Sequence, residues 1–465
     1  TTVYNTKKKS YLVTYFTADK PINTSDLSAY LQTKLTFYMV PTIYMQLESF
    51  PLTVNGKIDK NNLPEPQIKS EQVYVAPTTD LEKKLCEIWQ DLFGIEKIGI
   101  NDNFFDLGGD SLSAIKLQVE ALNYDLNISY SDIFTYPTIK LLATKASNEL
   151  PEMTVEKDTY DYTKINKLLS LNDITNIPNS IKTYELKNVL LTGTTGFLGS
   201  HILDAYLSST SKGIVYCFVR RKNLVNPEER LRKTLHFYFG NKYDKMFGER
   251  IKVITADITL ENFGLNAYDY ENLSKKINIV INSAALVKHY GEYEQFNDIN
   301  VLGTKRLIDF CKKYNKKLYH ISTASVSGMG LPENNEKKSE SVIHFSEKDL
   351  YKNQNLNNTY LKTKFEAEKL ILENINSGLD ACIFRMGNIS NRYSDSKFQI
   401  NVSENAFVNR IKSILKLKVL QEGFKAHATE FAPVDECAKA IIKIVQSNPK
   451  FTVFHIFNDN LISFE

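Results

Sequence analysis

Three residues in the second half of the chain, Thr323, Tyr360 and Lys364, have the types and spacing needed to reduce a carbonyl group. Tyr360 and Lys364 are four positions apart, so in a helix both side chains lie on one face. There the lysine ammonium is expected to lower the pKa of the phenol and to bind the ribose of a nicotinamide cofactor. Thr323 follows a predicted strand and is able to donate a hydrogen bond to a substrate oxygen. Since such Tyr–Lys pairs are common on helix surfaces, the pattern indicates catalysis only together with a cofactor site.

A glycine-rich turn earlier in the chain provides that cofactor site. The apolar run 188–192 predicts a buried parallel strand, which leads directly into the turn over 193–199 and then into a helix. Glycines in such a turn permit a sharp change of direction, close approach of a pyrophosphate, and close packing of the helix on the strand. A second predicted strand over 214–219 completes the context of a dinucleotide site. The predicted contacts are Thr192, Gly193, Thr195, Gly196, Phe197, Leu198 and Gly199.

The residues at the end of the second strand favour NADPH over NADH. NAD sites place an Asp or Glu there to bind the ribose 2′-hydroxyl. This chain has Arg220 and Arg221 instead, and Arg230 follows on the next predicted helix. Guanidinium groups bind a 2′-phosphate through charge-assisted hydrogen bonds worth roughly 1.5–3 kcal/mol each. We therefore expect Arg220 and Arg230 to bind that phosphate; a solvated basic run is the alternative.

Further strands are predicted at 251–256, 277–282, 318–322, 381–385 and 453–457. Strands that alternate with helices predict an α/β, Rossmann-like fold with a doubly wound parallel sheet. Asp257 and Ile258 close the third strand of the series, a place where an adenine ring is often bound. Ser283, Ala284 and Ala285 follow the fourth strand, and their small side chains let the backbone lie against a cofactor.

The first half of the chain contains a second motif, Phe104-Phe105-Asp106-Leu107-Gly108-Gly109-Asp110-Ser111-Leu112. Its glycines permit a tight loop, and Ser111 then stands at the start of a helix predicted over 111–123. A serine at the positive end of a helix dipole is a favourable position for a phosphate ester. Helices predicted over 77–92, 131–134 and 138–150 complete a four-helix bundle. An N-cap serine is the alternative, but the full string in this context indicates an attachment site.

Residues 1–66 have a different pattern, that of a small α+β subdomain. Strand signals occur at 10–17 and 42–47, and helix signals occur at 24–35. The Asn55-Gly56 pair predicts a turn that exposes Lys57. Polar linkers that contain proline follow residue 63 and residue 148. The predicted parts of the chain are therefore 1–66, 75–150 and 159–465.

Composition excludes several classes of function. A net charge of +3, with 42% hydrophobic and 24% charged residues, gives no whole-chain argument for binding nucleic acid or a membrane surface. The five cysteines have no Cys-x-x-Cys spacing, so neither a disulfide framework nor a metal site is indicated, and a cytoplasmic location is expected. The chain has no apolar run long enough to span a bilayer and no signal peptide. Its start at Thr1, without Met, suggests a piece of a longer protein.

Taken in order, these segments resemble the terminal module of a nonribosomal peptide synthetase. The stretch around Asn55-Gly56-Lys57 resembles the end of an adenylation domain, in which the matching lysine contacts the acyl phosphate. The string around Ser111 resembles the attachment site of peptidyl carrier proteins. Residues 186–465 resemble the thioester reductases of the extended short-chain dehydrogenase/reductase family. The residues that support this last resemblance are 190–199, Val219-Arg220, Asn282-Ser283-Ala284-Ala285, Asn300-Val301-Leu302-Gly303-Thr304, Tyr360 with Lys364, and Arg385-Met386-Gly387-Asn388.

The resemblance implies a reductive release of a carrier-bound product. An acyl or peptidyl thioester is held on a 4′-phosphopantetheine arm at Ser111, and NADPH delivers hydride to its carbonyl. Thr323 and Tyr360 stabilise and protonate the oxyanion, Lys364 tunes Tyr360 and positions the ribose, and the product leaves as an aldehyde or, after a second reduction, an alcohol. Implied partners are a phosphopantetheinyl transferase and upstream synthetase modules, including the adenylation core that residues 1–66 lack. The further implied cofactor contacts are Asn300, Met386, Gly387 and Asn388.

Other functions are compatible with the same motifs. A carboxylic acid reductase or aminoadipate reductase has the same architecture. A carrier scaffold with a redox-silent release domain is a second alternative. A nucleotide-sugar epimerase is a third, because it shares the glycine turn and the Tyr–Lys pair. The fused carrier and Arg220 argue against the epimerase. Reductases of this family usually continue past the last predicted strand, so we expect the substrate-binding part to be incomplete at Glu465.

Overall fold

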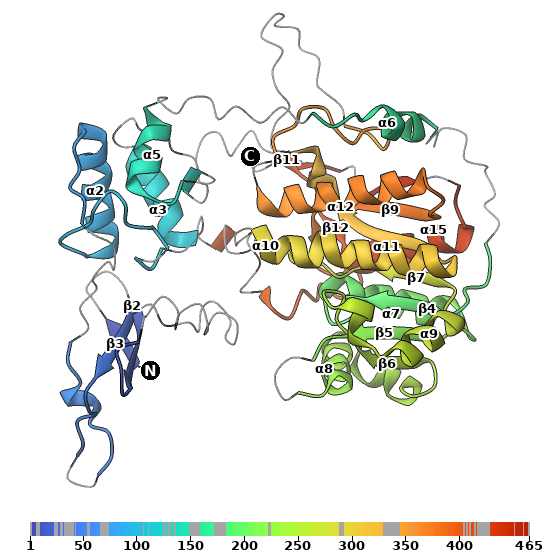
Figure 1. The fold of residues 1–465 in the computed structure, drawn as a ribbon, viewed down its shortest axis with the longest axis horizontal. Helices are drawn as coiled ribbons and strands as arrows, with labels where there is room; N and C mark the ends of the chain where they lie inside the picture. The colour runs from blue at the N-terminus through green and yellow to red at the C-terminus, as the bar shows by residue number, and fades with distance from the viewer. Residues whose placement is uncertain are drawn as a thin grey trace, which may run out of the picture. The chain divides into compact units, whose positions relative to one another are not determined.

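In the computed structural model the chain forms two compact units (Figure 1). The first unit comprises residues 1–158 and 405–419, and the second comprises residues 159–404 and 420–465. The residues that the structure describes are 2–5, 10–22, 43–53, 56–65, 74–105, 107–109, 111–122, 132–133, 136–147, 159–171, 183–221, 225–287, 293–328, 345–356, 358–402, 428–450, 452–458 and 460–463, with single positions 27, 31, 41, 124, 126, 128, 405, 408, 411, 412 and 415.

The N-terminal part is a small three-stranded sheet. Strands β1 (Thr2–Asn5) and β2 (Ser10–Thr17) pair antiparallel, and β3 (Ile43–Leu47) pairs parallel with β2. The strands expected at 10–17 and 42–47 are therefore confirmed, whereas most of the helix expected at 24–35 lies outside the described residues. Around Gly56, where the sequence predicts a turn, Leu52 and Ile58 form an antiparallel bridge and Lys57 is exposed. A short helix, η2 (Lys60–Asn62), follows.

The second part is helical, as predicted. Its elements are α2 (Asp80–Phe93), α3 (Ser111–Leu122) and α5 (Ile139–Ala146), and the short helix expected near 131–134 is described at 132 and 133. Trp89, Phe93 and Phe104 are fully buried and pack edge to face, with ring centroids 5.2–6.1 Å apart. Gly108 has φ +90°, and a Cβ on Gly109 would collide with the Phe104 ring. The glycines thus let the loop before α3 close over the aromatic core.

The larger unit is built on a seven-stranded parallel sheet with the strand order β13-β9-β8-β7-β4-β5-β6. Chain order reverses at β4, which pairs with β5 on one side and β7 on the other, so this is the doubly wound arrangement that the sequence predicts. Each strand lies within two residues, at either end, of its predicted range. The strands are β4 (Val189–Thr192), β5 (Val215–Val219), β6 (Ile251–Thr255), β7 (Ile279–Asn282), β8 (Lys317–Thr323), β9 (Ala381–Met386) and β13 (Val453–Ile456).

Helices cover both faces of this sheet. Alternate residues along a strand point to opposite faces, so Leu191 and Leu190 belong to different apolar clusters. One cluster joins the sheet to α7 (Phe197–Ser209), α8 (Pro227–Phe239) and α15 (Val434–Ser447). The other joins it to α6 (Thr163–Ser170), α9 (Ala267–Lys276), α11 (Gly303–Tyr314) and α12 (Thr359–Ile375). Both faces of every central strand are therefore buried, which explains the continuous apolar runs.

Shorter elements connect the main ones. Asn226 and Asn358 accept backbone N–H bonds as N-caps of α8 and α12, which sets where these helices begin. The remaining elements are η4 (Gly240–Met246), η5 (Glu261–Gly264), α10 (Tyr293–Phe296), the π-helix η6 (Asn297–Leu302), η7 (Ala324–Ser327), the parallel pair β10 (Ile389–Ser390) and β12 (Ala432–Pro433), and the antiparallel pair β11 (Ala428–Thr429) and β14 (Ile462–Ser463).

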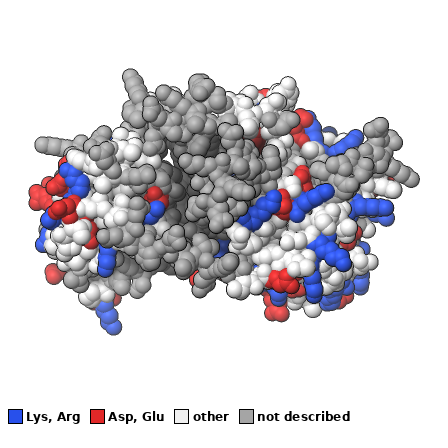
Figure 2. Space-filling view, turned by 90° about the horizontal axis from the view of Figure 1, so that it is seen from above, with Lys and Arg blue, Asp and Glu red and all other residues white. Residues whose placement is uncertain are grey.

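The visible surface has charges of both signs, and the cysteines are buried. Figure 2 shows Lys and Arg side chains interspersed with Asp and Glu on the visible face. No helix within the described ranges is both long enough and apolar enough to cross a membrane. Within those same ranges no three His, Cys, Asp or Glu side chains are placed to hold a metal ion. All five cysteines are free and buried, and burial raises the pKa of Cys86 to about 11, which is typical of apolar thiols.

Candidate active site

The predicted cofactor and catalytic residues follow neighbouring strands at one edge of the sheet. The glycine turn follows β4, Ser283 follows β7, and Thr323 ends β8, and these three strands lie side by side. In open parallel sheets, ligands bind outside the carboxyl ends of the strands where the chain order reverses. The reversal at β4 therefore places the predicted site at the position that this fold uses for binding.

The glycine turn has the close packing that its sequence predicts. Gly193 has φ +71°, and a Cβ there would collide with the Ser283 carbonyl. A Cβ on Gly199 would collide with the Gly193 carbonyl, so the first turn of α7 packs directly on the loop. The Gly196 N–H donates to the Gly193 carbonyl at 2.9 Å and closes the turn. The first turn of α7 therefore begins directly beside the loop, and binding of a pyrophosphate at this helix N-terminus stays a prediction.

Arg220 and Arg230 are brought together, as the sequence predicts. Arg220 follows β5 and is exposed, and Arg230 reaches it from the first turn of α8. The Arg230 Nη1 donates to the Arg220 carbonyl oxygen at 2.5 Å. Burial, together with the nearby Arg220 charge, lowers the pKa of Arg230. Two guanidinium groups at one strand end are the donor set that a phosphate requires.

Two of the three catalytic candidates, Thr323 and Tyr360, contact each other, and Lys364 lies one turn further along the same helix as Tyr360. Thr323 is the last residue of β8, Tyr360 lies in the first turn of α12, and Lys364 lies one turn further along that helix. The Thr323 hydroxyl forms a side-chain hydrogen bond with Tyr360 that lowers the pKa of the phenol, but burial outweighs it and raises that pKa to about 12. Burial lowers the pKa of Lys364 to about 8. Its Nζ donates to the Ile321 carbonyl oxygen at 2.5 Å.

This arrangement corrects one expectation. The spacing predicts that the Lys364 ammonium lowers the pKa of Tyr360, whereas in the structure that pKa is raised. The physical reason is desolvation: Lys364 is buried and Tyr360 is partly buried, and each is pushed toward its neutral form. The Lys364 amine is directed to the β8 backbone and to His320.

The predicted cofactor contacts after β6 and β7 form hydrogen bonds and apolar contacts within the protein. Asp257 accepts from the Thr259 N–H at 2.9 Å and from its hydroxyl at 2.8 Å, and Ile258 is buried against Gly303. The small residues 283–285 are half-buried, and the Ala284 N–H donates to Thr192 Oγ1 at 3.1 Å. Each of these contacts fixes the loop in which it lies, and binding of cofactor there stays a prediction.

Asn300, on the π-helical turn η6, ties two parts of the site together. Its Oδ1 accepts from the Leu286 N–H at 2.8 Å, and its Nδ2 donates to Thr363 Oγ1 at 3.1 Å. The amide therefore links the loop after β7 to α12, the helix that holds Tyr360 and Lys364. Contact between Asn300 and a cofactor stays a prediction.

At the end of β9 the predicted contacts Met386, Gly387 and Asn388 turn away from the strand. Met386 is buried, whereas Asn388 is exposed. The Asn388 N–H donates to Glu430 Oε1, and its side-chain amide donates to Thr429 at 3.1 Å. Burial raises the pKa of Glu430. The backbone after β9 is thereby held at the same edge of the sheet as Thr323.

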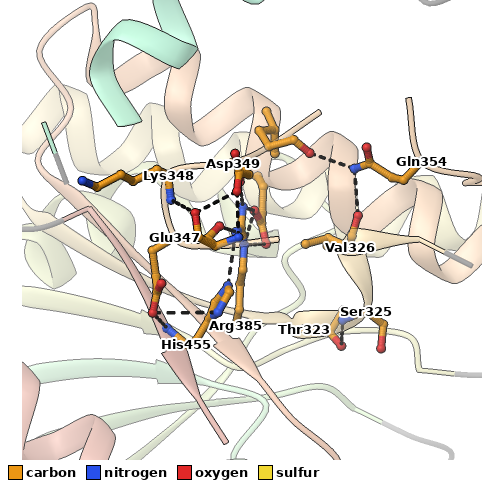
Figure 3. Close-up of polar contacts among 12 residues, drawn as sticks. Thr323, Ser325, Val326, Glu347, Lys348, Asp349, Gln354, Arg385 and His455 are labelled. Atoms are coloured by element: carbon orange, nitrogen blue, oxygen red, sulfur yellow. Dashed lines mark hydrogen bonds and ion pairs between the residues drawn. The ribbon is translucent and has the colours of Figure 1, made fainter. Parts of the chain in front are cut away.

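A buried ion pair that the sequence did not predict joins α12, the helix of Tyr360 and Lys364, to β9. Arg385, on β9, and Glu368, one turn after Lys364 on α12, are both completely buried, with Nη2 and Oε2 2.8 Å apart. The guanidinium also donates to the Ser346 carbonyl at 3.1 Å and the Asp349 carbonyl at 2.8 Å, and it approaches His455 at 3.4 Å (Figure 3). Arg385 thus joins β9, α12 and the segment before α12.

Sequence reasoning also missed Gln354 and His320. Gln354 is 2% exposed, and its Nε2 donates to the carbonyls of Val326 at 3.0 Å and Leu350 at 2.8 Å, which ties η7 to the segment before α12 (Figure 3). His320 is buried within β8, three residues before Thr323. The available signal was a histidine inside an apolar strand run, Leu318-Tyr319-His320-Ile321.

Ser111 begins a helix, as the sequence predicts, and attachment of an arm there stays a prediction. It is the first residue of α3, and the described loop residues 107–109 precede it in the chain. The helix N-terminus directs free backbone N–H groups and the positive end of the dipole toward this position.

Comparisons with known proteins assign both regions. A family model described as "Male sterility protein", of the NAD-binding type, matches residues 191–441, and a model described as "Phosphopantetheine attachment site" matches residues 83–145. A solved thiolation-reductase di-domain from an archaeal nonribosomal peptide synthetase is 38% identical with a TM-score of 0.70, covering 84% of this chain and 80% of that one. The chain belongs to this family of carrier-linked, NAD-binding reductases.

Other relatives agree with this membership. The reductase domain of the aureusimine biosynthetic cluster is 26% identical with a TM-score of 0.55, over 65% of this chain and 77% of that one. A linear gramicidin synthase protein from Brevibacillus parabrevis is 28% identical over 98% of this chain. The large chain of L-2-aminoadipate reductase from Candida glabrata is 26% identical over 90% of it. The chain spans only 9% and 32% of the lengths of these last two proteins, so it corresponds to a part of each.

Proposed function

We propose that this carrier-linked reductase releases an acyl or peptidyl group from its carrier by NADPH-dependent reduction of the thioester to an aldehyde. In this proposal residues 1–66 are the end of an adenylation domain, 75–150 the carrier, and 159–465 the reductase. The observation that supports it best is the hydrogen bond between Thr323 and Tyr360, with Lys364 one turn further along α12, in a chain that also matches the phosphopantetheine attachment site family.

The residues present fit a dinucleotide cofactor. Gly193 and Gly199 have no room for a Cβ, so the loop lies directly against the first turn of α7, whose N-terminus would face a pyrophosphate, and Arg220 with Arg230 would offer donors to a 2′-phosphate. When bound, NADPH supplies the hydride that reduces the thioester carbonyl. The chain's own residues then act on the substrate oxygen.

Tyr360 and Thr323 act directly on that oxygen. Tyr360 is a phenol whose pKa is raised to about 12, so it holds its proton at neutral pH and is able to donate it as negative charge develops on the oxygen. The Thr323 hydroxyl, already hydrogen-bonded to Tyr360, stabilises the same charge. Lys364, anchored on the Ile321 carbonyl, positions the ribose and the phenol.

The proposed function and its cofactor are tested together by one assay. We expect the 465-residue chain to oxidise NADPH when a soluble acyl-pantetheine thioester is added, with an aldehyde or alcohol as product, and to use NADH poorly. Arg220→Ala should weaken NADPH binding by about 10- to 100-fold, because one or two charge-assisted hydrogen bonds are lost, and leave NADH binding unchanged. Arg221→Ala, which removes the adjacent exposed arginine, is the matched control. Equal losses in both variants would mean that a basic run attracts anions without forming a phosphate site.

The carrier part is tested by attachment of the arm. A phosphopantetheinyl transferase with coenzyme A should add the mass of one arm to the chain, and Ser111→Ala should abolish that addition. Ser113→Ala, which removes a buried hydroxyl from the same helix, is the control and should be modified like the parent chain. Intact-protein mass spectrometry with peptide mapping gives the result, and an arm on any other residue would contradict the assignment.

A further inference from the structure

Gln354 is a buried glutamine that joins the two segments from which Thr323 and Tyr360 extend. It is 2% exposed and lies in the segment 345–356, which precedes α12 in the chain. Its Nε2 donates to the Val326 carbonyl of η7 at 3.0 Å (Figure 3). Val326 comes three residues after Thr323, and Gln354 comes six residues before Tyr360. One side chain therefore connects the turn after β8 with the approach to α12.

The partners of the Gln354 amide determine its orientation. Its Nε2 donates to the carbonyls of Val326 at 3.0 Å and Leu350 at 2.8 Å, and its Oε1 accepts from the Lys352 N–H at 2.7 Å. Carbonyls only accept and a backbone N–H only donates, so a half-turn of the amide would place like groups against each other at every partner. The turn that brings Lys352 and Gln354 together includes Asn353 at φ +58°, a left-handed conformation that asparagine adopts more readily than most residues.

The backbone at Gln354 also packs directly on the end of η7. Gly328, the residue after η7, has φ +78°, and a Cβ there would lie 2.7 Å from Gln354 Cβ and 2.7 Å from the Asn355 carbonyl oxygen. The Gly328 N–H donates to the Ser325 carbonyl at 2.9 Å and closes the turn. The contact between the two segments therefore includes backbone packing at Gly328 as well as the hydrogen bonds of the Gln354 amide.

η7 in turn determines where the Thr323 hydroxyl is held. Thr323 is the N-cap of η7, and its Oγ1 accepts from the Ser325 N–H at 3.2 Å. Because this oxygen accepts from the backbone, its own proton is left to donate. The hydrogen bond between Thr323 and Tyr360 lowers the pKa of the phenol, which is the effect of donation to the phenol oxygen. A displacement of η7 would therefore move the Thr323 hydroxyl relative to Tyr360.

Contacts on its other side hold the segment 345–356 in place. Arg385 of β9 donates to the Asp349 carbonyl at 2.8 Å. Leu350 is completely buried in the apolar cluster that joins the sheet to α12. Neither of these contacts involves η7. Gln354 therefore connects a segment that is attached to β9 and to the core with the turn that follows β8.

We propose that Gln354 is a positioning residue whose amide holds η7 against the segment before α12 and thereby holds the Thr323 hydroxyl against Tyr360. Both N–H groups of its amide are donated within the protein, so it acts through Thr323 and not on the substrate itself. The effect on catalysis rests on the proposed function, whereas the attachment of η7 does not.

The first test is a double-mutant cycle on the single-turnover rate of NADPH oxidation with an acyl-pantetheine thioester. Gln354→Met keeps the length of the side chain and removes its hydrogen bonds, so it should lower the rate by about 10-fold, because small misplacements of a catalytic group have at least this effect. In a Thr323→Val chain the same change should lower the rate by less than about 2-fold, because the hydroxyl that Gln354 positions is already gone. An unchanged rate in the parent chain, or equal losses with and without the Thr323 hydroxyl, would overturn the proposal. Should Gln354→Met not fold, Gln354→Glu, which keeps an oxygen for the Lys352 N–H, takes its place in the cycle.

The matched control is Gln46, on β3 of the N-terminal sheet, because its amide makes the same set of contacts. Its Nε2 donates to the carbonyls of Ala18 at 3.4 Å and Lys20 at 2.9 Å, and its Oε1 accepts from the Ile22 N–H at 2.9 Å. Gln46→Met should therefore reduce thioester at the parent rate. A loss equal to that of Gln354→Met would show that the effect is not specific to the turn after β8, and the proposal would fail.

The second test measures the mobility of η7 without any turnover. Amide hydrogen exchange of the 465-residue chain is followed by mass spectrometry in the parent and in Gln354→Met. The peptide that contains Ser325 and Gly328 should exchange about 10-fold faster in the variant, because the Val326 carbonyl loses its donor and the turn opens more often. Peptides from α3 should exchange at the parent rate.

The two tests separate this inference from the proposed function. Equal exchange at η7 in the parent and in Gln354→Met would contradict the positioning role, whether or not the chain reduces thioesters. Absence of NADPH oxidation in the parent chain would contradict the proposed function alone, and exchange at η7 would still decide whether Gln354 holds this turn.

Discussion

Tyr360→Phe is expected to lower the rate of NADPH-dependent thioester reduction by at least about 100-fold, because general acid catalysis contributes about 10²–10⁴-fold and phenylalanine has no proton to donate. NADPH affinity should be nearly unchanged, since the proposed cofactor contacts are the glycine turn after β4 and the arginines after β5 and on α8. The measurement is single-turnover NADPH oxidation with an acyl-pantetheine thioester, together with a separate binding titration.

The control for Tyr360 removes a different tyrosine hydroxyl from the same domain. Tyr314, at the end of α11, donates its hydroxyl to Glu271 at 3.1 Å on the surface. Tyr314→Phe should therefore keep the parent rate. A Tyr360→Phe variant that binds NADPH and reduces thioester at the parent rate would show that another group protonates the substrate.

Arg385→Met should destabilise the reductase domain by about 3–5 kcal/mol, because it leaves the fully buried Glu368 carboxylate without its partner. It also removes the donors to the Ser346 and Asp349 carbonyls, so the segment before α12 loses its attachment to β9. Urea unfolding followed by far-ultraviolet circular dichroism measures the effect. Tryptophan fluorescence would report on the wrong domain, because the single tryptophan, Trp89, lies in the carrier.

Two further variants distinguish the effect of breaking a buried ion pair from that of breaking an exposed one. Arg385→Met combined with Glu368→Met should recover much of the lost stability, since no unpaired charge remains buried. Lys233→Met breaks an exposed pair with Glu229 on α8 and should change stability by less than about 1 kcal/mol. If the double variant is as unstable as Arg385→Met, the backbone contacts of the guanidinium, and not the charge pair, hold this part of the fold.

Local patterns in the sequence were sufficient for much of the fold and of the candidate site. The strand before Gly193, the helix after Gly199 and the four-residue spacing of Tyr360 and Lys364 predicted elements that the structure contains, because backbone freedom and helical periodicity depend on neighbouring residues. The start of α3 at Ser111 was predictable for the same reason. Where these elements would meet also followed, since parallel strands place their carboxyl ends at one edge.

Only the tertiary structure decided which partners these residues have. His320 and Lys364 are 44 positions apart and Glu368 and Arg385 are 17 apart, and no local pattern pairs them. The direction of the pKa change at Tyr360 was predicted wrongly for a related reason. Spacing indicates which groups are neighbours on a helix, whereas burial is the combined effect of every element packed around them. The sequence by itself thus determined the identity and order of the chemical groups. Their protonation states and hydrogen-bond partners depend on how β7, β8, β9 and α12 pack, because removal of water is a property of the assembled sheet.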